Sequence, residues 1–170
     1  MNGEEFQDVV NFLEGTPDAI LQLSGALIGS DLTWKPAADE FSAVEQVCHL
    51  RDIEREGYCV RIRKLLAEER PQLPDIDGSR LALERDYNRQ DFTTAFQEFA
   101  QAREENLRTL RELAPEQLGR SGVLDGVGEI TLAGLLLLMR EHDQAHRREM
   151  ADLCERRAKM KDESAATQAV

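Results

Sequence analysis

The three histidines of the chain carry most of its functional information. His142 and His146 lie four residues apart in a segment with helical periodicity, and His49 lies in an earlier segment of the same kind. An α-helix turns about 100° per residue, so side chains at i and i+4 project from one face about a turn apart. Two imidazoles placed in this way, joined by a third from a neighbouring helix, can hold one divalent cation and leave positions open for water or substrate. This spacing predicts a metal site of the catalytic type.

Four amphipathic segments must position these histidines. Apolar residues recur with helical spacing over residues 4–28, 42–68, 91–113 and 131–157. Thr16-Pro17 predicts a kink or a new helix start within the first segment, and Ser42 with Glu45 forms a capping box that opens the second. The sequence shows neither strand-like alternation nor a repeat. It therefore predicts an all-α fold, a four-helix bundle with long connections between helices 1 and 2, 2 and 3, and 3 and 4.

Length and charge limit the remaining possibilities. Residues 1–157 are expected to form a single domain, and the polar, small residues 158–170 predict a disordered tail. The formal net charge of −12 disfavours nucleic-acid binding, and no apolar run approaches the ~20 residues of a membrane span. The acidic N-terminus lacks the basic and apolar regions of a signal peptide. We therefore expect a cytoplasmic protein that binds neither nucleic acid nor membrane.

The three cysteines do not look like metal ligands. Cys48, Cys59 and Cys154 form no C-x-x-C spacing, which indicates reduced thiols and not a disulfide framework. On a helical wheel Cys48 and Cys59 fall about 80–100° from His49. We expect all three to be small, buried or half-buried apolar residues.

Several polar residues are candidates for the surroundings of the metal. Glu56 falls about 20° from His49 on the helical wheel, two turns further on, and is the candidate pocket carboxylate. Arg103 and Asn106 lie within the apolar stripe of the third helix, where they either pair across the core or line a pocket. Four acidic residues near the histidines are either orienting partners of the rings or solvated helix surface: Glu45, Asp52, Glu141 and Asp143.

Two parts of the sequence resemble the DinB/YfiT-like superfamily. Trp34-Lys35-Pro36, followed by Glu-Phe-Ser-Ala-Val-Glu-Gln-Val-Cys-His-Leu-Arg-Asp-Ile-Glu over residues 40–54, is similar to the end of its first helix and the start of its second. Gly-Glu-Ile-Thr-Leu at 128–132, followed by His-Asp-Gln-Ala-His at 142–146, resembles its last helix with an H-x-x-x-H motif. The likeness runs in order from Phe6 to Leu153. Phe41 stands where the family often has Trp, a conservative packing change.

The resemblance implies a four-helix bundle of unusual connectivity, a homodimer, and a nickel or zinc ion held by His49, His142 and His146. Characterised members of the family include metal-dependent transferases and isomerases that use low-molecular-weight thiols such as bacillithiol or mycothiol. The leading hypothesis is therefore a thiol S-transferase-like enzyme acting on a small-molecule substrate. A hydrolase that uses metal-activated water, a non-catalytic stress-related bundle that binds a metal or ligand, and a purely structural bundle remain alternatives. The family name refers to induction by DNA damage and does not imply DNA binding.

Overall fold

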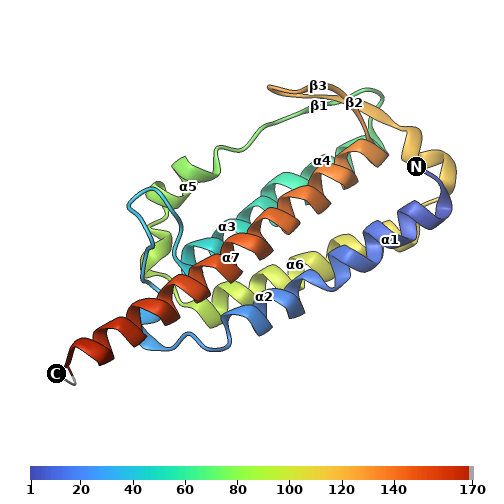
Figure 1. Ribbon diagram of the computed structural model, residues 1–170. Coiled ribbons are helices and arrows are strands. Elements are labelled where there is room, and N and C mark those ends of the chain that lie inside the picture. The colour runs from blue at the N-terminus through green and yellow to red at the C-terminus, as the bar shows by residue number, and fades with distance from the viewer. Residues whose placement is uncertain (169–170) are drawn as a thin grey trace.

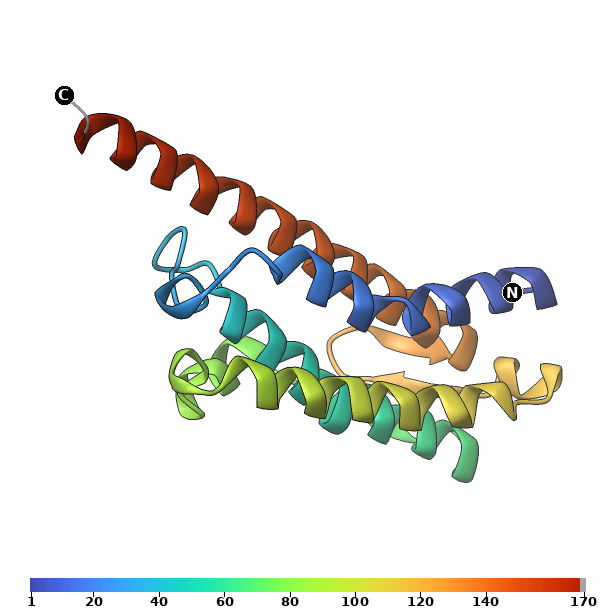
Figure 2. The same ribbon diagram turned by 90° about the horizontal axis from the view of Figure 1, so that it is seen from below.

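The computed structural model describes residues 1–168, and four long helical segments run side by side through it (Figures 1 and 2). The seven α-helices of the described residues are α1 Gly3–Glu14, α2 Thr16–Ser24, α3 Ala43–Asp52, α4 Cys59–Ala67, α5 Gly78–Glu84, α6 Phe92–Arg111 and α7 Leu132–Gln168. The first bundle segment consists of α1 and α2, and the second of α3 and α4. The third is α6 and the fourth is α7. The predicted four-helix bundle is confirmed.

The second and third bundle segments run in the same direction, as the chain colours of Figure 1 show. The chain must therefore return along the bundle between α4 and α6, which explains the length of the connection from 68 to 91. This connection contains a two-residue strand, the short helix α5 and a 3₁₀ turn at Tyr87–Arg89. The connection between α2 and α3 is also long, and it passes over the same end of the bundle as α5 (Figure 1).

The first bundle segment restarts where Thr16-Pro17 predicts it. Asn2 and Glu5 form a capping box at the start of α1, and α2 begins directly after Gly15 with Pro17 in its first turn. Thr16 does not cap this new helix. Its hydroxyl donates to the carbonyl of Phe12 at 3.1 Å, and the start of α2 has no side-chain cap.

The second bundle segment begins at the predicted capping box. The Ser42 amide donates to Glu45 Oε2 at 2.8 Å, and the Glu45 amide donates to Ser42 Oγ at 3.2 Å. Between α3 and α4 the chain forms a π-helical segment, Ile53–Tyr58, which the apolar pattern did not predict. Such wide turns hold one extra residue and recur at functional positions. Here the wide turn changes which residues face the bundle interior.

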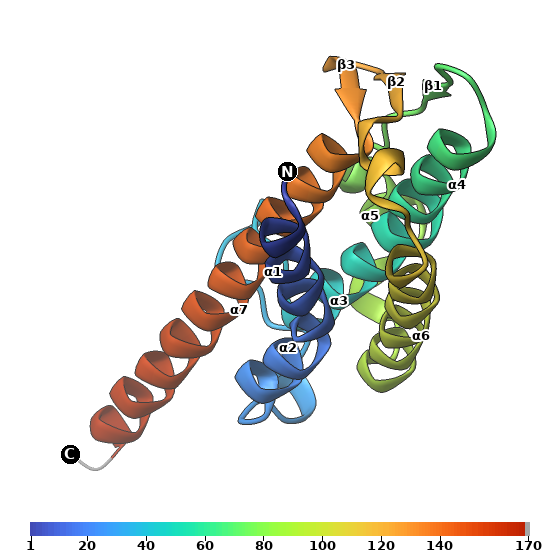
Figure 3. The same ribbon diagram turned by 90° about the vertical axis from the view of Figure 1, so that its right-hand side faces the viewer.

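A small three-stranded sheet lies at the end of the bundle where α4 ends and α7 begins (Figure 3). It consists of β1 Gln72–Leu73, β2 Ser121–Leu124 and β3 Gly128–Thr131, with β2 antiparallel to β3 and parallel to β1. The expectation of no strands is therefore wrong. Strands of two to four residues are too short to show alternation in the sequence. The β2–β3 turn uses Gly126 and Gly128 at φ of 76° and 101°, a conformation that favours glycine.

The fourth bundle segment differs from its expected end. The sequence predicts disorder from residue 158, but α7 continues to Gln168, and the last two residues of the chain lie outside the described residues. Arg157 Nε donates to Asp31 Oδ1 at 2.9 Å, and Lys161 pairs with the other oxygen of the same carboxylate. These two ion pairs attach the helix to the turn that follows α2. Within residues 1–168, no helix has both the length and the apolar character that crossing a bilayer requires.

A buried guanidinium joins the four bundle segments. Arg103, on α6, is 1% exposed. It donates two hydrogen bonds to the carboxylate of Glu54, at 3.0 and 2.9 Å, and two to Asp143 on α7, at 2.6 and 3.1 Å. It also donates to the backbone carbonyl of Leu13 on α1, at 2.9 Å. Burial opposes ionisation of Asp143, but the charge of Arg103 outweighs it and lowers the pKa of Asp143 to about 2.

Replacing Arg103 with Met should lower the free energy of unfolding by about 3–5 kcal/mol, because Glu54 and Asp143 would remain buried without a counter-charge. Urea denaturation followed by circular dichroism measures the change. Arg108→Met on the same helix is the control, since Arg108 is exposed and its loss should change stability by no more than about 0.5 kcal/mol. A loss below about 1 kcal/mol for Arg103→Met would show that the buried network contributes little to stability.

Candidate metal centre

The three histidines converge on one point between two bundle segments. His49 comes from α3, and His142 and His146 come from one face of α7. The Nε2 atom of His142 lies 3.0 Å from that of His49 and 3.2 Å from that of His146. All three residues offer nitrogen atoms within 4.8 Å of one another. The sequence prediction that these histidines meet is confirmed.

These separations fit a cation held by three imidazoles. With metal–nitrogen bonds of about 2.0–2.1 Å and ligand angles between octahedral and tetrahedral, neighbouring nitrogens lie about 2.8–3.4 Å apart. A neutral imidazole has one N–H and one lone pair, so three ring nitrogens facing one point cannot all satisfy one another by hydrogen bonds. A cation that accepts three lone pairs removes this conflict. The residues therefore fit a divalent metal.

For two of the three rings, the environment favours the neutral form that a metal requires. Burial, together with the charges of the two neighbouring histidines, lowers the pKa of His49 to about 3. The pKa of His142 is also lowered, chiefly by burial.

Polar neighbours hold the ring of His146. Its Nδ1 atom contacts the side-chain oxygen of Gln46 and lies 3.0 Å from Glu149 Oε2. Gln46 in turn donates to the same oxygen of Glu149 at 2.9 Å. The contact with His146 is the main cause that lowers the pKa of Glu149 to about 2. A carboxylate and an amide oxygen at Nδ1 favour a proton there, which leaves the Nε2 lone pair free for a metal.

The other two rings are held less by hydrogen bonds than by packing. His142 Nδ1 lies 3.9 Å from Asp143 Oδ1, longer than a hydrogen bond, and His49 Nδ1 is buried without a partner among residues 1–168. The backbone of Gly78, at the start of α5, lies directly against the His49 ring. A Cβ atom at this position would overlap the ring atoms Cε1 and Nδ1. Glycine is thus required here for His49 to keep its place.

A cleft of about 430 Å³ opens beside His49 and His146. Its walls come from four parts of the chain: the connection before α3, the first half of α3, the start of α5, and α7 after His146. Besides the two histidines, the lining residues are Pro36, Asp39, Glu40, Phe41, Gln46, Gly78, Ser79, Glu149, Asp152 and Leu153. Two of the long connections therefore form walls of this cleft.

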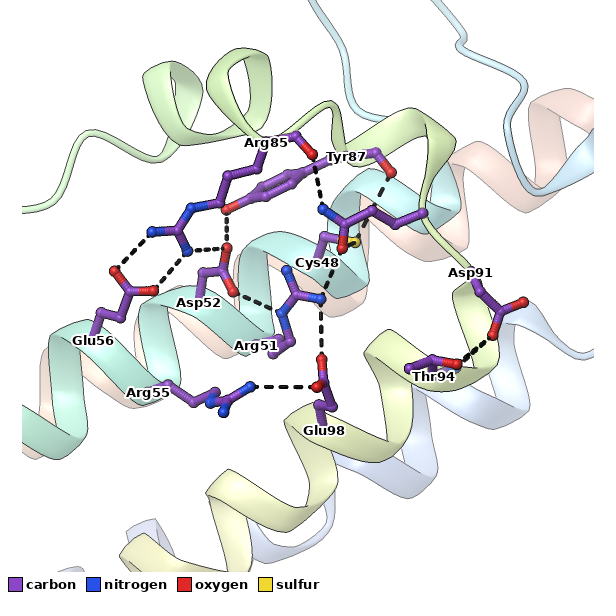
Figure 4. Close-up of polar contacts among 11 residues, drawn as sticks. Cys48, Arg51, Asp52, Arg55, Glu56, Arg85, Tyr87, Asp91, Thr94 and Glu98 are labelled. Carbon is purple, nitrogen blue, oxygen red and sulfur yellow. Dashed lines mark hydrogen bonds and ion pairs between the residues drawn. The ribbon is translucent and has the colours of Figure 1, made fainter.

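The other predicted pocket residues lie elsewhere. Glu56 is exposed and pairs with Arg85 at 2.6 and 3.0 Å, beside Asp52 (Figure 4). The helical wheel that placed Glu56 near His49 assumed a regular α-helix. The π-helical segment rotates less about the helix axis per residue, so Glu56 faces away from His49. Arg103 and Asn106 are buried, and both contact Glu54. They pair across the core, which is one of the two alternatives that the sequence left open.

The acidic neighbours and the cysteines also differ in their roles. Glu45 caps α3 and pairs with Lys35, and Asp52 binds Arg51, Arg85 and Tyr87 (Figure 4). Glu141 is exposed, and Asp143 Oδ1 lies 3.9 Å from His142 Nδ1. Cys48 faces Gln90, and none of the cysteines belongs to the histidine cluster.

Sequence reasoning missed Gln46, Glu149 and Gly78. Gln46 lies three residues before His49, and Glu149 lies three residues after His146, so both share a helix face with a histidine. That spacing would have identified them. The position of Gly78 depends on how the connection before α6 folds, and no local pattern indicates it.

The structure is thus a helical bundle with a candidate metal site of three histidines beside a cleft. Comparisons with known proteins identify its family. The sequence profile of the DinB superfamily matches residues 13–150, and the chain belongs to that superfamily. A comparison with curated proteins found no match. Among solved structures, the chain is similar to YfiT from Bacillus subtilis, described as a probable metal-dependent hydrolase with an unusual four-helix bundle topology. The TM-score is 0.86 at 21% sequence identity, over 93% of this chain and 90% of that one.

Replacing His142 or His146 with Ala should remove most of the bound metal, because two imidazoles hold a divalent cation much less tightly than three. Elemental analysis of protein purified without a histidine tag measures the metal per chain. Gln144→Ala is the control, since Gln144 is exposed between the two histidines. Full metal content in the double histidine variant would refute the ligand assignment.

Replacing Gly78 with Ala should weaken metal binding by about tenfold or more, because the methyl group displaces His49 from its position. Competition with a chromophoric chelator measures the affinity. Gly119→Ala is the matched control, since a Cβ atom there meets nothing within 4 Å. Unchanged affinity in Gly78→Ala would mean that the His49 ring moves freely, or is not a ligand.

Proposed function

We propose that this protein is a metal-dependent enzyme, with His49, His142 and His146 as the ligands of one divalent cation. The observation that carries the proposal is the convergence of three Nε2 atoms at 3.0 and 3.2 Å beside an open cleft. A purely structural role does not account for three histidine rings that face one another. Zinc and nickel are the metals we propose, because neutral imidazole suits both.

When bound, such a cation supplies Lewis-acid polarisation of a carbonyl and activation of water. The chain contributes the rest. Gln46 and Glu149 fix the ring of His146, and Gly78 holds His49 in place. Phe41, whose ring centre lies 5.5 Å from that of His49, covers one side of the cleft. Together these residues hold the ligands rigidly while the cleft admits a small molecule.

Hydrolysis is the reaction that we propose first. The cleft is lined by carboxylates, and an anionic thiol cofactor such as bacillithiol would be repelled by them. Hydrolysis uses water as the second reactant, and water, unlike a thiol cofactor, does not need a separate binding site in the cleft. The similar structure of YfiT, described as a probable metal-dependent hydrolase, supports the same reaction class. Thiol transfer remains the second candidate, because three imidazoles leave positions at which a thiolate can bind a metal.

Two further proposals concern the state of the protein. We propose a homodimer, as the family resemblance implies, and sedimentation velocity of the metal-loaded chain tests it. We also propose a cytoplasmic protein without nucleic-acid partners, which agrees with the net charge of −12.

The metal-loaded protein should hydrolyse simple esters or amides, and the rate should fall by at least about a hundredfold after chelation or in His146→Ala. p-Nitrophenyl esters and amino-acid p-nitroanilides give the rate directly, with Gln144→Ala as the active control. The same protein is assayed in parallel with a small thiol and an aromatic electrophile. Metal-dependent conjugation without hydrolysis would favour thiol transfer, and absence of both would favour a non-catalytic metal-binding bundle.

A further inference from the structure

The charges around the cleft indicate which molecules it can hold, an inference that rests on the proposed metal-dependent function. The three-histidine cluster and the cleft define the site, and the lining residues fix the charge of its occupant. Every charged residue that lines the cleft is acidic: Asp39, Glu40, Glu149 and Asp152. No lysine or arginine is among the lining residues that the structure describes.

Neighbouring cations neutralise only part of this charge. Arg156 pairs with Glu40 at 2.7 Å and approaches Asp152 at 3.4 Å. Glu149 contacts Gln46 and His146, and it has no lysine or arginine partner within residues 1–168. Asp39 is exposed and has no ion pair within residues 1–168. Four carboxylates against one guanidinium leave a formal excess of three negative charges along the cleft.

A metal held by the histidines would place a positive charge in the wall of the same cleft, which His49 and His146 line. The metal and the carboxylates would then select for different groups. A carbonyl oxygen or an anionic head suits the metal, whereas the carboxylates repel a second negative charge and attract a positive one. Pro36, Phe41 and Leu153 add apolar surface to the cleft walls, which suits a short linker.

We propose that the substrate is a small carbonyl compound, an ester or amide, that also carries a protonated amine. The carbonyl faces the histidine cluster, and the amine faces Asp39 and Asp152. In the reaction, the oxygen of water forms a bond to the carbonyl carbon and the bond from that carbon to the leaving oxygen or nitrogen breaks. The leaving group takes one proton of the water, and the products are a carboxylic acid and an alcohol or amine. The step needs no oxidant or reductant.

Three hydroxamates of similar length test the proposal, because each presents the same metal-binding head. They are 3-aminopropanohydroxamate with an amine tail, butanohydroxamate with a neutral tail, and succinic monohydroxamate with a carboxylate tail. Their dissociation constants are measured from the visible spectrum of the cobalt-loaded protein. We expect the amine compound to bind at least about tenfold more tightly than the carboxylate compound, and the difference to shrink at high ionic strength.

The double variant Asp39→Asn, Asp152→Asn should reduce this preference to about threefold or less, with little change for the neutral compound. Asp125→Asn, in the exposed β2–β3 turn, should keep the full preference. Equal binding of the amine and carboxylate compounds to the wild type, or tighter binding of the carboxylate compound, would overturn the substrate class and leave the metal-dependent function standing. Failure of His49, His142 and His146 to bind cobalt would overturn the proposed function and this inference with it.

Discussion

The guanidinium of Arg103 is the interaction on which the arrangement of the bundle depends. All four bundle segments meet at it, through Leu13, Glu54, Asp143 and α6 itself. A buried cation requires partners with good geometry on every side, because an unpaired charge in the interior is costly. The angles and heights of the segments relative to one another must satisfy these contacts at the same time.

The contacts of Arg103 also fix the positions of the helices that carry the metal centre. Asp143 is bound by Arg103, and the next residue toward the N-terminus is His142, so the network fixes the face that α7 presents to α3. Glu54 belongs to the π-helical segment that follows His49 by one turn. The same wide turn brings Glu54 to Arg103 and moves Glu56 to the surface, where Arg85 pairs with it (Figure 4). The second bundle segment and α7 thus each carry both a carboxylate that binds Arg103 and a histidine of the metal centre.

Features that depend on local periodicity could be predicted from the sequence. The four segments, the Ser42–Glu45 capping box and the convergence of His49 with His142 and His146 follow from spacing and from the family resemblance. The π-helical segment could not be predicted, because the apolar spacing of residues 42–68 fits a regular α-helix and the partners of Glu54 lie far away in the sequence. The short sheet and the contact of Gly78 with His49 likewise depend on chain segments that meet only in the folded state. Two of the cleft carboxylates, Asp39 and Glu40, lie on such a segment, the connection before α3, whereas Glu149 shares a helix face with His146 and could have been found from its spacing.

X-ray absorption spectroscopy of the zinc-loaded protein tests the central claim most directly, because it reports the ligand atoms of the metal itself. We expect a first shell with three imidazole nitrogens at about 2.0–2.1 Å, completed by light atoms from solvent. The imidazole contribution should fall by about one ring in His49→Ala. A sulfur shell near about 2.3 Å would assign the metal to a cysteine, and a shell without imidazole would place it on surface carboxylates. Either result would contradict a metal centre formed by His49, His142 and His146.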